Sequence, residues 1–118
     1  MINIKHVDLD MIQTVTDATF NDLVLKSSGP VAVEFMSYGC GFCRAIEPIL
    51  QQVTEKLHSE LKIFRVNVPA QSELAGTYEI EGTPTFVMFL DGNEIARSEG
   101  PDPTMANITA MLTQPFKI

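Results

Sequence analysis

Short apolar runs alternate along this chain with segments whose apolar residues recur at helical spacing. The apolar runs have the length and composition of β-strands, and they cover residues 11–15, 31–36, 61–68, 85–90 and 93–97. Helical spacing is found after Thr16-Asp17 as far as Gly29, after Cys43 as far as Leu57, over residues 72–78, and from Asp102 to Leu112. The predicted order of elements is therefore β-α-β-α-β-α-β-β-α.

Glycine, proline and capping residues separate these segments. Pro30 opens the second strand, at a position where a sheet tolerates proline. Asp91-Gly92 lies between two strand segments and is the residue pair expected in a tight hairpin turn. At the last helix we expect Asp102 to be the N-cap, with Pro103 at the first helical position.

This order predicts an α/β fold with a central mixed sheet flanked by helices. Three parallel strands with right-handed crossovers come first, and an antiparallel hairpin follows. The segment 31–36 is apolar on both faces, so we expect it to be the buried central strand. It contains one carboxylate, Glu34.

Length and charge restrict the class of protein. The 118 residues fit one domain, 1–118, in which residues 1–10 precede the strand and helix pattern as an N-terminal extension. Fifteen acidic residues against eight basic ones give a net charge of −7, which argues against nucleic acid or an anionic membrane as a main partner. Nothing in the sequence requires more than a monomer.

The cellular location is also suggested by the sequence. No apolar run reaches the roughly 18–20 residues that a membrane span needs. Residues 1–10 alternate between polar and apolar, whereas a signal peptide has one apolar block. We therefore expect a cytoplasmic protein, and in that compartment a lone cysteine pair is more often catalytic than structural.

The only two cysteines, Cys40 and Cys43, are separated by two residues and lie between a predicted strand and a predicted helix. At that place the helix N-terminus favours a thiolate at the first sulfur. A structural zinc site needs four ligands, and the two histidines, His6 and His58, have no ligand spacing, so no metal is predicted. A structural disulfide here would close too small a loop to stabilise the fold much. The pattern favours a redox-active dithiol.

The order of elements, the Cys-Gly-Phe-Cys stretch after the second strand and Gly82-Thr83-Pro84-Thr85 before the fourth together resemble the thioredoxin family. The resemblance runs from about Met11 to the C-terminus. Individual positions also agree with the family, namely Phe35, Gly41, Pro48, Asn67, Tyr78, Gly82, Pro84, Thr85, Gly92 and Gly100. It implies a thioredoxin fold, a cis peptide bond before Pro84 and packing of that proline against the cysteines. Gly41, between the cysteines, is a supporting residue.

The chain departs from the family pattern around the cysteines. The family has Trp-Cys-Gly-Pro-Cys, and this chain has Gly39 in place of the tryptophan and Phe42 in place of the proline. A second family tryptophan is Met36 here, so the whole chain lacks tryptophan. An atypical thioredoxin is the interpretation that these residues favour.

Three departures concern polar residues. The buried aspartate of the family is Glu34 here, one methylene longer, and its neighbouring lysine is Arg65. The isoleucine before the cis proline is Thr83, a choice that resembles disulfide isomerases and periplasmic oxidases.

Each cysteine has an expected role. Cys40, at the helix start, is the candidate nucleophile that attacks a substrate disulfide and forms a mixed disulfide. Cys43, one turn further into the helix, is the resolving thiol that releases the reduced substrate. The alternative is a pair of inert buried cysteines.

Glu34 is expected to assist. Burial should raise the pKa of this carboxyl toward neutrality, which suits a base that takes the proton from Cys43, through water. Arg65 could pair with Glu34 and lower that pKa. The alternative is a purely structural pair of Glu34 with Arg65.

The substrate groove is expected beside Thr83 and Pro84. The backbone of Thr83 could pair with an extended substrate segment, and Gly39 would leave the groove open, as would Gly82. Phe42 either docks substrate or packs against the helix.

Three functions remain open at this point. The first is a protein disulfide reductase without a bound cofactor, recharged by a flavoprotein similar to thioredoxin reductase. The second is an oxidase or isomerase, because the Cys-Gly-Phe-Cys stretch and Thr83 depart from the strongly reducing pattern. The third is a binding module whose redox turnover is incidental, since the missing tryptophans remove apolar contact area.

Overall fold

A computed structural model describes residues 10–118, and these form one five-stranded sheet with helices on both faces. The strands are β1 (Gln13–Thr14), β2 (Pro30–Met36), β3 (Lys62–Asn67), β4 (Thr85–Leu90) and β5 (Asn93–Ser98). The helices are η2 (Asn21–Leu25), α1 (Gly41–Leu57), η3 (Val68–Ala70), α2 (Ser72–Thr77), α3 (Met105–Thr113) and η4 (Gln114–Phe116). The ordered lead-in suggested by Ile2, Ile4, Val7 and Leu9 lies outside the described residues.

The strand order in the sheet is β1-β3-β2-β4-β5. β1 and β2 both run parallel to β3, and β4 runs antiparallel to β2 and to β5. This arrangement confirms the predicted sheet of three parallel strands followed by an antiparallel hairpin. It also confirms that β2 is central, with Glu34 opposite Arg65 on one side and Phe86 on the other.

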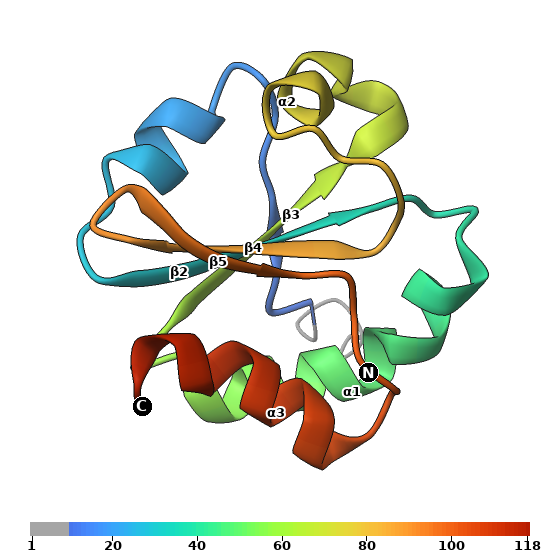
Figure 1. Cartoon of the computed structure of the whole chain (residues 1–118), viewed down its shortest axis with the longest axis vertical. Coiled ribbons are helices and arrows are strands. Elements are labelled where there is room, and N and C mark those ends of the chain that lie inside the picture. Colours follow the sequence, from blue (N-terminus) through green and yellow to red (C-terminus); the bar gives the residue numbers. More distant parts are fainter. Residues whose placement is uncertain (1–9) are drawn as a thin grey trace, which may run out of the picture.

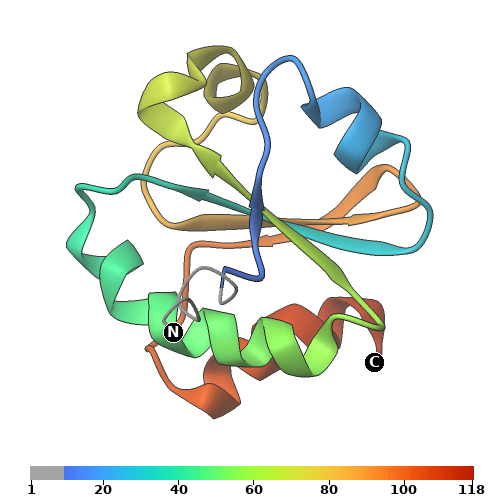
Figure 2. The ribbon, with the colours of Figure 1, turned by 180° about the vertical axis from the view of Figure 1, so that it is seen from behind.

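Two helical layers cover the sheet. Helices α1 and α3 lie on one face, while η2 and α2 lie on the other (Figure 1). The view from behind gives the same arrangement (Figure 2). Because side chains alternate along β2, its residues divide between the two layers. Ala32 packs in the core under α1 and α3, whereas Val33 and Phe35 pack in the core under η2 and α2. By the same alternation Glu34 points toward α1.

The first strand and the first helix are shorter than the sequence predicts. β1 has two residues rather than five, and the expected helix after Asp17 is a single π-helical turn of five residues. The hydroxyl of Thr19 accepts a hydrogen bond from the Thr16 amide at 2.9 Å, and the Thr19 amide donates back to the Thr16 carbonyl at 3.1 Å. Such local side-chain bonds compete with regular helix, so the helical turn begins only after Phe20.

The last helix begins later than predicted. Thr104, not Asp102, is its N-cap, because the Thr104 hydroxyl accepts from the Asn107 amide at 3.1 Å. Its extended backbone (φ −124°, ψ 156°) is the usual N-cap conformation. Pro103 therefore precedes the cap and is not the first helical residue.

The hairpin turn confirms the prediction from Asp91-Gly92. Both residues have positive φ, 51° and 83°, as a two-residue turn of the favoured type requires. The turn also packs against the end of η2, where a Cβ on Gly92 would overlap the carbonyl oxygen of Leu25. Glycine is thus required here both for backbone conformation and for space.

None of the helices among residues 10–118 combines the length and the apolar character that crossing a bilayer requires.

Candidate active site

The cysteine pair lies at the junction between β2 and α1. Cys40 is the N-cap residue of α1, with extended backbone (φ −84°, ψ 117°), and its Sγ accepts a hydrogen bond from the Cys43 amide at 3.1 Å. The Cys40 amide donates to the Ser37 carbonyl at 3.1 Å, which closes the turn before the helix. The sequence therefore places one sulfur among the free amides of a helix N-terminus, where negative charge is favoured.

Several groups act on the Cys40 thiol. Burial by itself raises the pKa of Cys40, but hydrogen bonds from the Cys43 thiol, the Thr83 side chain and the amides of Cys43 and Phe42 together bring it below the ordinary value. As a thiol, Cys40 can also donate to the Thr83 carbonyl oxygen, 3.5 Å away. Cys40 is thus half-buried, hydrogen-bonded and the more acidic thiol of the pair.

Cys43 has the opposite character. Only 2% of it is exposed. Burial raises the pKa of Cys43 to about 11, and its hydrogen bond to Cys40 contributes to the rise. The first proton of the pair therefore leaves from Cys40, while Cys43 needs a nearby base before it can react near neutral pH.

The loop before β4 faces the cysteine pair. The Thr83–Pro84 peptide bond is cis, as the resemblance implies, and Pro84 is buried while Thr83 is half-buried. A hollow of about 310 Å³ lies beside this loop, lined by Glu81, Gly82, Thr83, Pro84, Thr85 and Glu99. Thr83 thus contributes both to this hollow and to the hydrogen bond with Cys40.

Phe42 lies over the same region. Its side chain is 39% exposed, and a Cβ placed on Gly100 would lie 3.5 Å from Phe42 Cε2 and 3.1 Å from Pro84 Cγ. Phe42 is therefore close to the cis proline and open to solvent at once. Gly100 has a φ of 93° and leaves the space that this approach needs.

The glycines near the pair are open. A Cβ on Gly41 or on Gly82 would meet no atom within 4 Å, and one on Gly39 would meet only the Ser37 hydroxyl, at 3.9 Å. Because these three residues have no side chain, they leave open space next to the two sulfurs.

Glu34 lies in the middle of β2 with no exposed surface. Burial raises the pKa of Glu34 from 4.5 to about 7, since the opposing charge of Arg65 only partly offsets the burial and the nearby Glu47 and Cys40 raise it further. Both of its carboxylate oxygens lack a hydrogen-bond partner among the described residues. Arg65 does pair with Glu34, but at an ion-pair distance of 3.9 Å from Arg65 Nε to Glu34 Oε1 and without a hydrogen bond.

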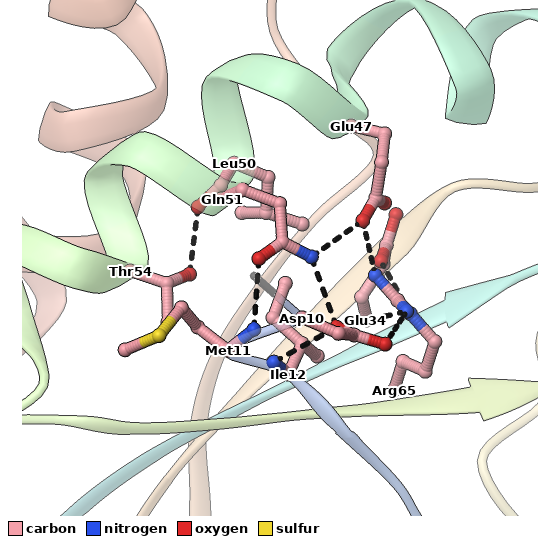
Figure 3. Close-up of polar contacts among 9 residues, drawn as sticks. All are labelled: Asp10, Met11, Ile12, Glu34, Glu47, Leu50, Gln51, Thr54 and Arg65. Carbon is pink, nitrogen blue, oxygen red and sulfur yellow. Dashed lines mark hydrogen bonds and ion pairs between the residues drawn. The ribbon is translucent and has the colours of Figure 1, made fainter. Parts of the chain in front are cut away.

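Arg65 donates hydrogen bonds from its terminal nitrogens to two other carboxylates (Figure 3). Its Nη2 lies 2.6 Å from Glu47 Oε2, and its Nη1 lies 3.4 Å from Asp10 Oδ2. The Gln51 amide donates to both carboxylates, at 2.8 Å to Glu47 and 3.0 Å to Asp10. Arg65 is 4% exposed, so this network of charged and polar side chains is largely enclosed between α1 and the sheet at its guanidinium.

Sequence reasoning did not identify Glu47, Gln51 or Asp10. A signal for Glu47 was available, because Cys43 and Glu47 are four residues apart and so share a face of α1. The structure bears this out in a small pocket of about 160 Å³ whose lining includes Cys43, Glu47 and Arg65.

Within residues 10–118 no three His, Cys, Asp or Glu side chains are grouped closely enough to hold a metal ion.

Comparisons with known proteins agree with this geometry. The family model described as Thioredoxin matches residues 11–114. Thioredoxin 1 of Synechococcus elongatus is 35% identical over 101 residues, which cover 84% of this chain and 94% of that protein. Thioredoxin of Pseudomonas aeruginosa is 37% identical over 89 residues, which cover 75% and 82%. Thioredoxin Y, chloroplastic, of Oryza sativa is 38% identical over 88 residues, and the match spans only 52% of its length.

Proposed function

The chain belongs to the thioredoxin family of thiol–disulfide oxidoreductases, and we propose that it acts mainly as a protein disulfide reductase. The observation that carries this proposal is the contrast between its two thiols. Cys40 is half-buried, with a pKa below the ordinary value, and Cys43 is buried, with a pKa of about 11. One thiol is suited to begin an exchange and the other to finish it.

In the first step the Cys40 thiolate attacks one sulfur of a substrate disulfide. A new disulfide forms between Cys40 and that sulfur, and the other substrate sulfur leaves as a thiolate. In the second step Cys43 gives up its proton to Glu34 and attacks Cys40 Sγ. The Cys40–Cys43 disulfide forms, the remaining substrate sulfur leaves as a thiolate, and the substrate has gained two electrons.

Glu34 suits this second step because its pKa of about 7 lies near neutral pH. A carboxyl with such a value is ionised often enough to accept a proton and is basic enough to hold one. Water would carry the proton from Cys43 to Glu34.

Substrate binding is assigned to the loop before β4. Within residues 10–118 the Thr83 amide makes no backbone hydrogen bond, so it is free to pair with an extended substrate segment. Pro84 would form the wall of the groove, and Phe42 would offer an apolar contact next to the attacking sulfur. Gly39 and Gly82 would let the substrate backbone approach.

The partners follow from the electron balance. Protein disulfides are the substrates, and a reductase similar to thioredoxin reductase returns two electrons to the Cys40–Cys43 disulfide. A monomer without its own cofactor is sufficient for this cycle. A cytoplasmic location is part of the proposal, since that compartment keeps such a dithiol reduced.

The direct test is insulin reduction in the presence of dithiothreitol. The protein should precipitate the insulin B chain several-fold faster than dithiothreitol does alone, because Cys40 is the more acidic thiol. A rate equal to the uncatalysed one, for protein with both thiols reduced, would reject the proposed reductase.

One observation favours a second candidate, a disulfide oxidase or isomerase. The Thr83 side chain is among the groups that lower the pKa of Cys40, and a stabilised thiolate favours the reduced form of the enzyme. About 30 mV corresponds to ~1.4 kcal/mol for this two-electron couple, so one hydrogen bond can change the role.

A redox titration against glutathione separates the two candidates. For a reductase we expect a potential near the roughly −270 mV of a typical thioredoxin, and Thr83→Ile should move it little. A potential tens of millivolts higher that Thr83→Ile brings down would instead assign the oxidising role to the Thr83 contact.

A further inference from the structure

The guanidinium of Arg65 forms ion pairs with three carboxylates but hydrogen bonds with only two of them. Its distances are 2.6 Å to Glu47 and 3.4 Å to Asp10, both through terminal nitrogens, against 3.9 Å to Glu34. Glu34 is fully buried and would gain most from a cation, yet it has the longest contact. The other two carboxylates are partly exposed, with side-chain exposures of 33% for Glu47 and 56% for Asp10.

From this geometry we propose that Glu47 is a positioning residue, which draws the Arg65 guanidinium away from Glu34 and keeps that buried carboxyl without a hydrogen-bonded cation. For its effect on catalysis the inference rests on the proposed role of Glu34 as proton acceptor. Glu47 itself does not touch the reacting sulfurs in this scheme. Its positioning effect is exerted through Arg65, in addition to the direct repulsion between the Glu47 and Glu34 carboxylates.

The arrangement is fixed by Gln51, one helical turn after Glu47 on α1. Its amide nitrogen donates to Glu47 Oε2 at 2.8 Å and to Asp10 Oδ1 at 3.0 Å. Its amide oxygen accepts from the Met11 backbone at 2.8 Å, which ties the chain just before β1 to the same point (Figure 3). A neutral side chain thus holds two carboxylates together around one guanidinium and relieves their mutual repulsion.

The charged groups around Glu34 come from two of the elements packed against it. Arg65 faces it from β3, Glu47 from α1 and Cys40 from the start of α1, whereas its neighbour on β4 is the apolar Phe86. Arg65 is the sole cation of this set, so its position decides how strongly the Glu34 anion is stabilised. A close arginine lowers a carboxyl pKa by about 1–3 units.

The test measures the ionisation of Glu34 directly, by ¹³C NMR titration of the glutamate side-chain carboxyls, with Glu34 assigned from its loss in Glu34→Gln. In Glu47→Ala the Arg65 guanidinium loses its closest partner and should move to Glu34. We expect the Glu34 midpoint to fall by about one pH unit or more. Glu55→Ala is the matched control, because Glu55 is on the same helix, exposed, and outside the network; it should leave the midpoint unchanged.

Glu47→Gln distinguishes positioning from simple charge repulsion. Both substitutions remove the negative charge, but glutamine keeps an oxygen that can accept from Arg65 Nη2. Positioning therefore predicts a smaller fall in Glu47→Gln than in Glu47→Ala. Equal falls would reduce Glu47 to a nearby charge and overturn the inference, as would an unchanged midpoint in both variants.

Two further measurements complete the test. If Glu47→Ala does not fold, Gln51→Ala, which releases the two carboxylates, should lower the Glu34 midpoint in the same direction, and an unchanged midpoint there contradicts the inference. In folded Glu47→Ala, the pH profile of mixed-disulfide resolution should move to lower pH with the carboxyl titration. A midpoint that moves while the profile stays would support the positioning of Arg65 and reject Glu34 as the proton acceptor.

Discussion

Replacing Cys40 with serine is expected to abolish disulfide reduction, leaving only the rate of the uncatalysed reaction. The serine hydroxyl cannot ionise at neutral pH, so the interactions at the start of α1 no longer produce a nucleophile. Cys43 cannot take over, since it is only 2% exposed and its pKa is about 11. Insulin reduction and mass spectrometry of the protein after exposure to a small disulfide would both report the loss.

Cys43→Ser is the informative counterpart. The first attack by Cys40 remains possible, but resolution is not, so we expect a stable mixed disulfide after one turnover. Adduct formation by Cys40→Ser, or its absence in Cys43→Ser, would reverse the assigned roles. The trapped adducts also address the binding-module hypothesis: several partners indicate an enzyme, and one partner that stays bound without Cys40 indicates a module.

Replacing Glu34 with glutamine is expected to stabilise the protein at alkaline pH. The pKa of Glu34 is raised from 4.5 to about 7, so the folded state binds the proton more tightly than the unfolded state does. Below about pH 4.5 both states are protonated and there is no penalty. As pH rises from about 4.5 to about 7, Glu34 ionises first in the unfolded state. Above pH 7 the resulting loss of stability reaches roughly 3 kcal/mol.

Glutamine removes that penalty without leaving Arg65 unpaired. Arg65 donates no hydrogen bond to Glu34, and it keeps Glu47 and Asp10. We therefore expect Glu34→Gln to unfold at higher denaturant than the parent near pH 8.5 and at a similar concentration near pH 4, with slower resolution of the mixed disulfide by stopped flow. A variant that is less stable near pH 8.5 and resolves at the normal rate would identify a structural ion pair instead.

The parts of the fold that the sequence predicts well have local causes. Apolar residues on both faces of β2, the Asp91-Gly92 turn and the helical spacing after Cys43 each need only near neighbours to be interpreted. The predicted start of α3 was wrong because Asp102 and Thr104 are both good N-cap residues. Only the backbone conformation at Thr104 decides between them. The first helix is shorter than predicted because Thr16 and Thr19 hydrogen-bond to each other, and this local bond is also not visible in the apolar pattern.

The candidate site was likewise predictable only where its residues are close together in the sequence. The cysteine pair and the burial of Glu34 follow from one strand and one helix. The partners of Arg65 do not, because Asp10 is 55 residues away and Glu47 is 18 residues away in the chain. Sheet register brings Glu34 and Arg65 side by side, and the pairing of these two residues was an expectation that the ion pair at 3.9 Å bears out. Which carboxylates accept hydrogen bonds from the guanidinium depends on how far side chains from three segments extend, and no sequence pattern encodes that.

The aromatic residues give the molecule an unusual optical behaviour. With no tryptophan in the sequence, its near-ultraviolet emission comes from two tyrosines, which lie in very different surroundings. Tyr78 is enclosed by Phe20, Phe35 and Phe89, with ring centroids 5.5–5.9 Å away. Tyr38 is 60% exposed and lines the same small pocket as Cys43. We therefore expect Tyr78 emission to report on packing around the three phenylalanines and Tyr38 emission to respond to changes at the neighbouring cysteine pair, and a substitution at either tyrosine would separate the two signals.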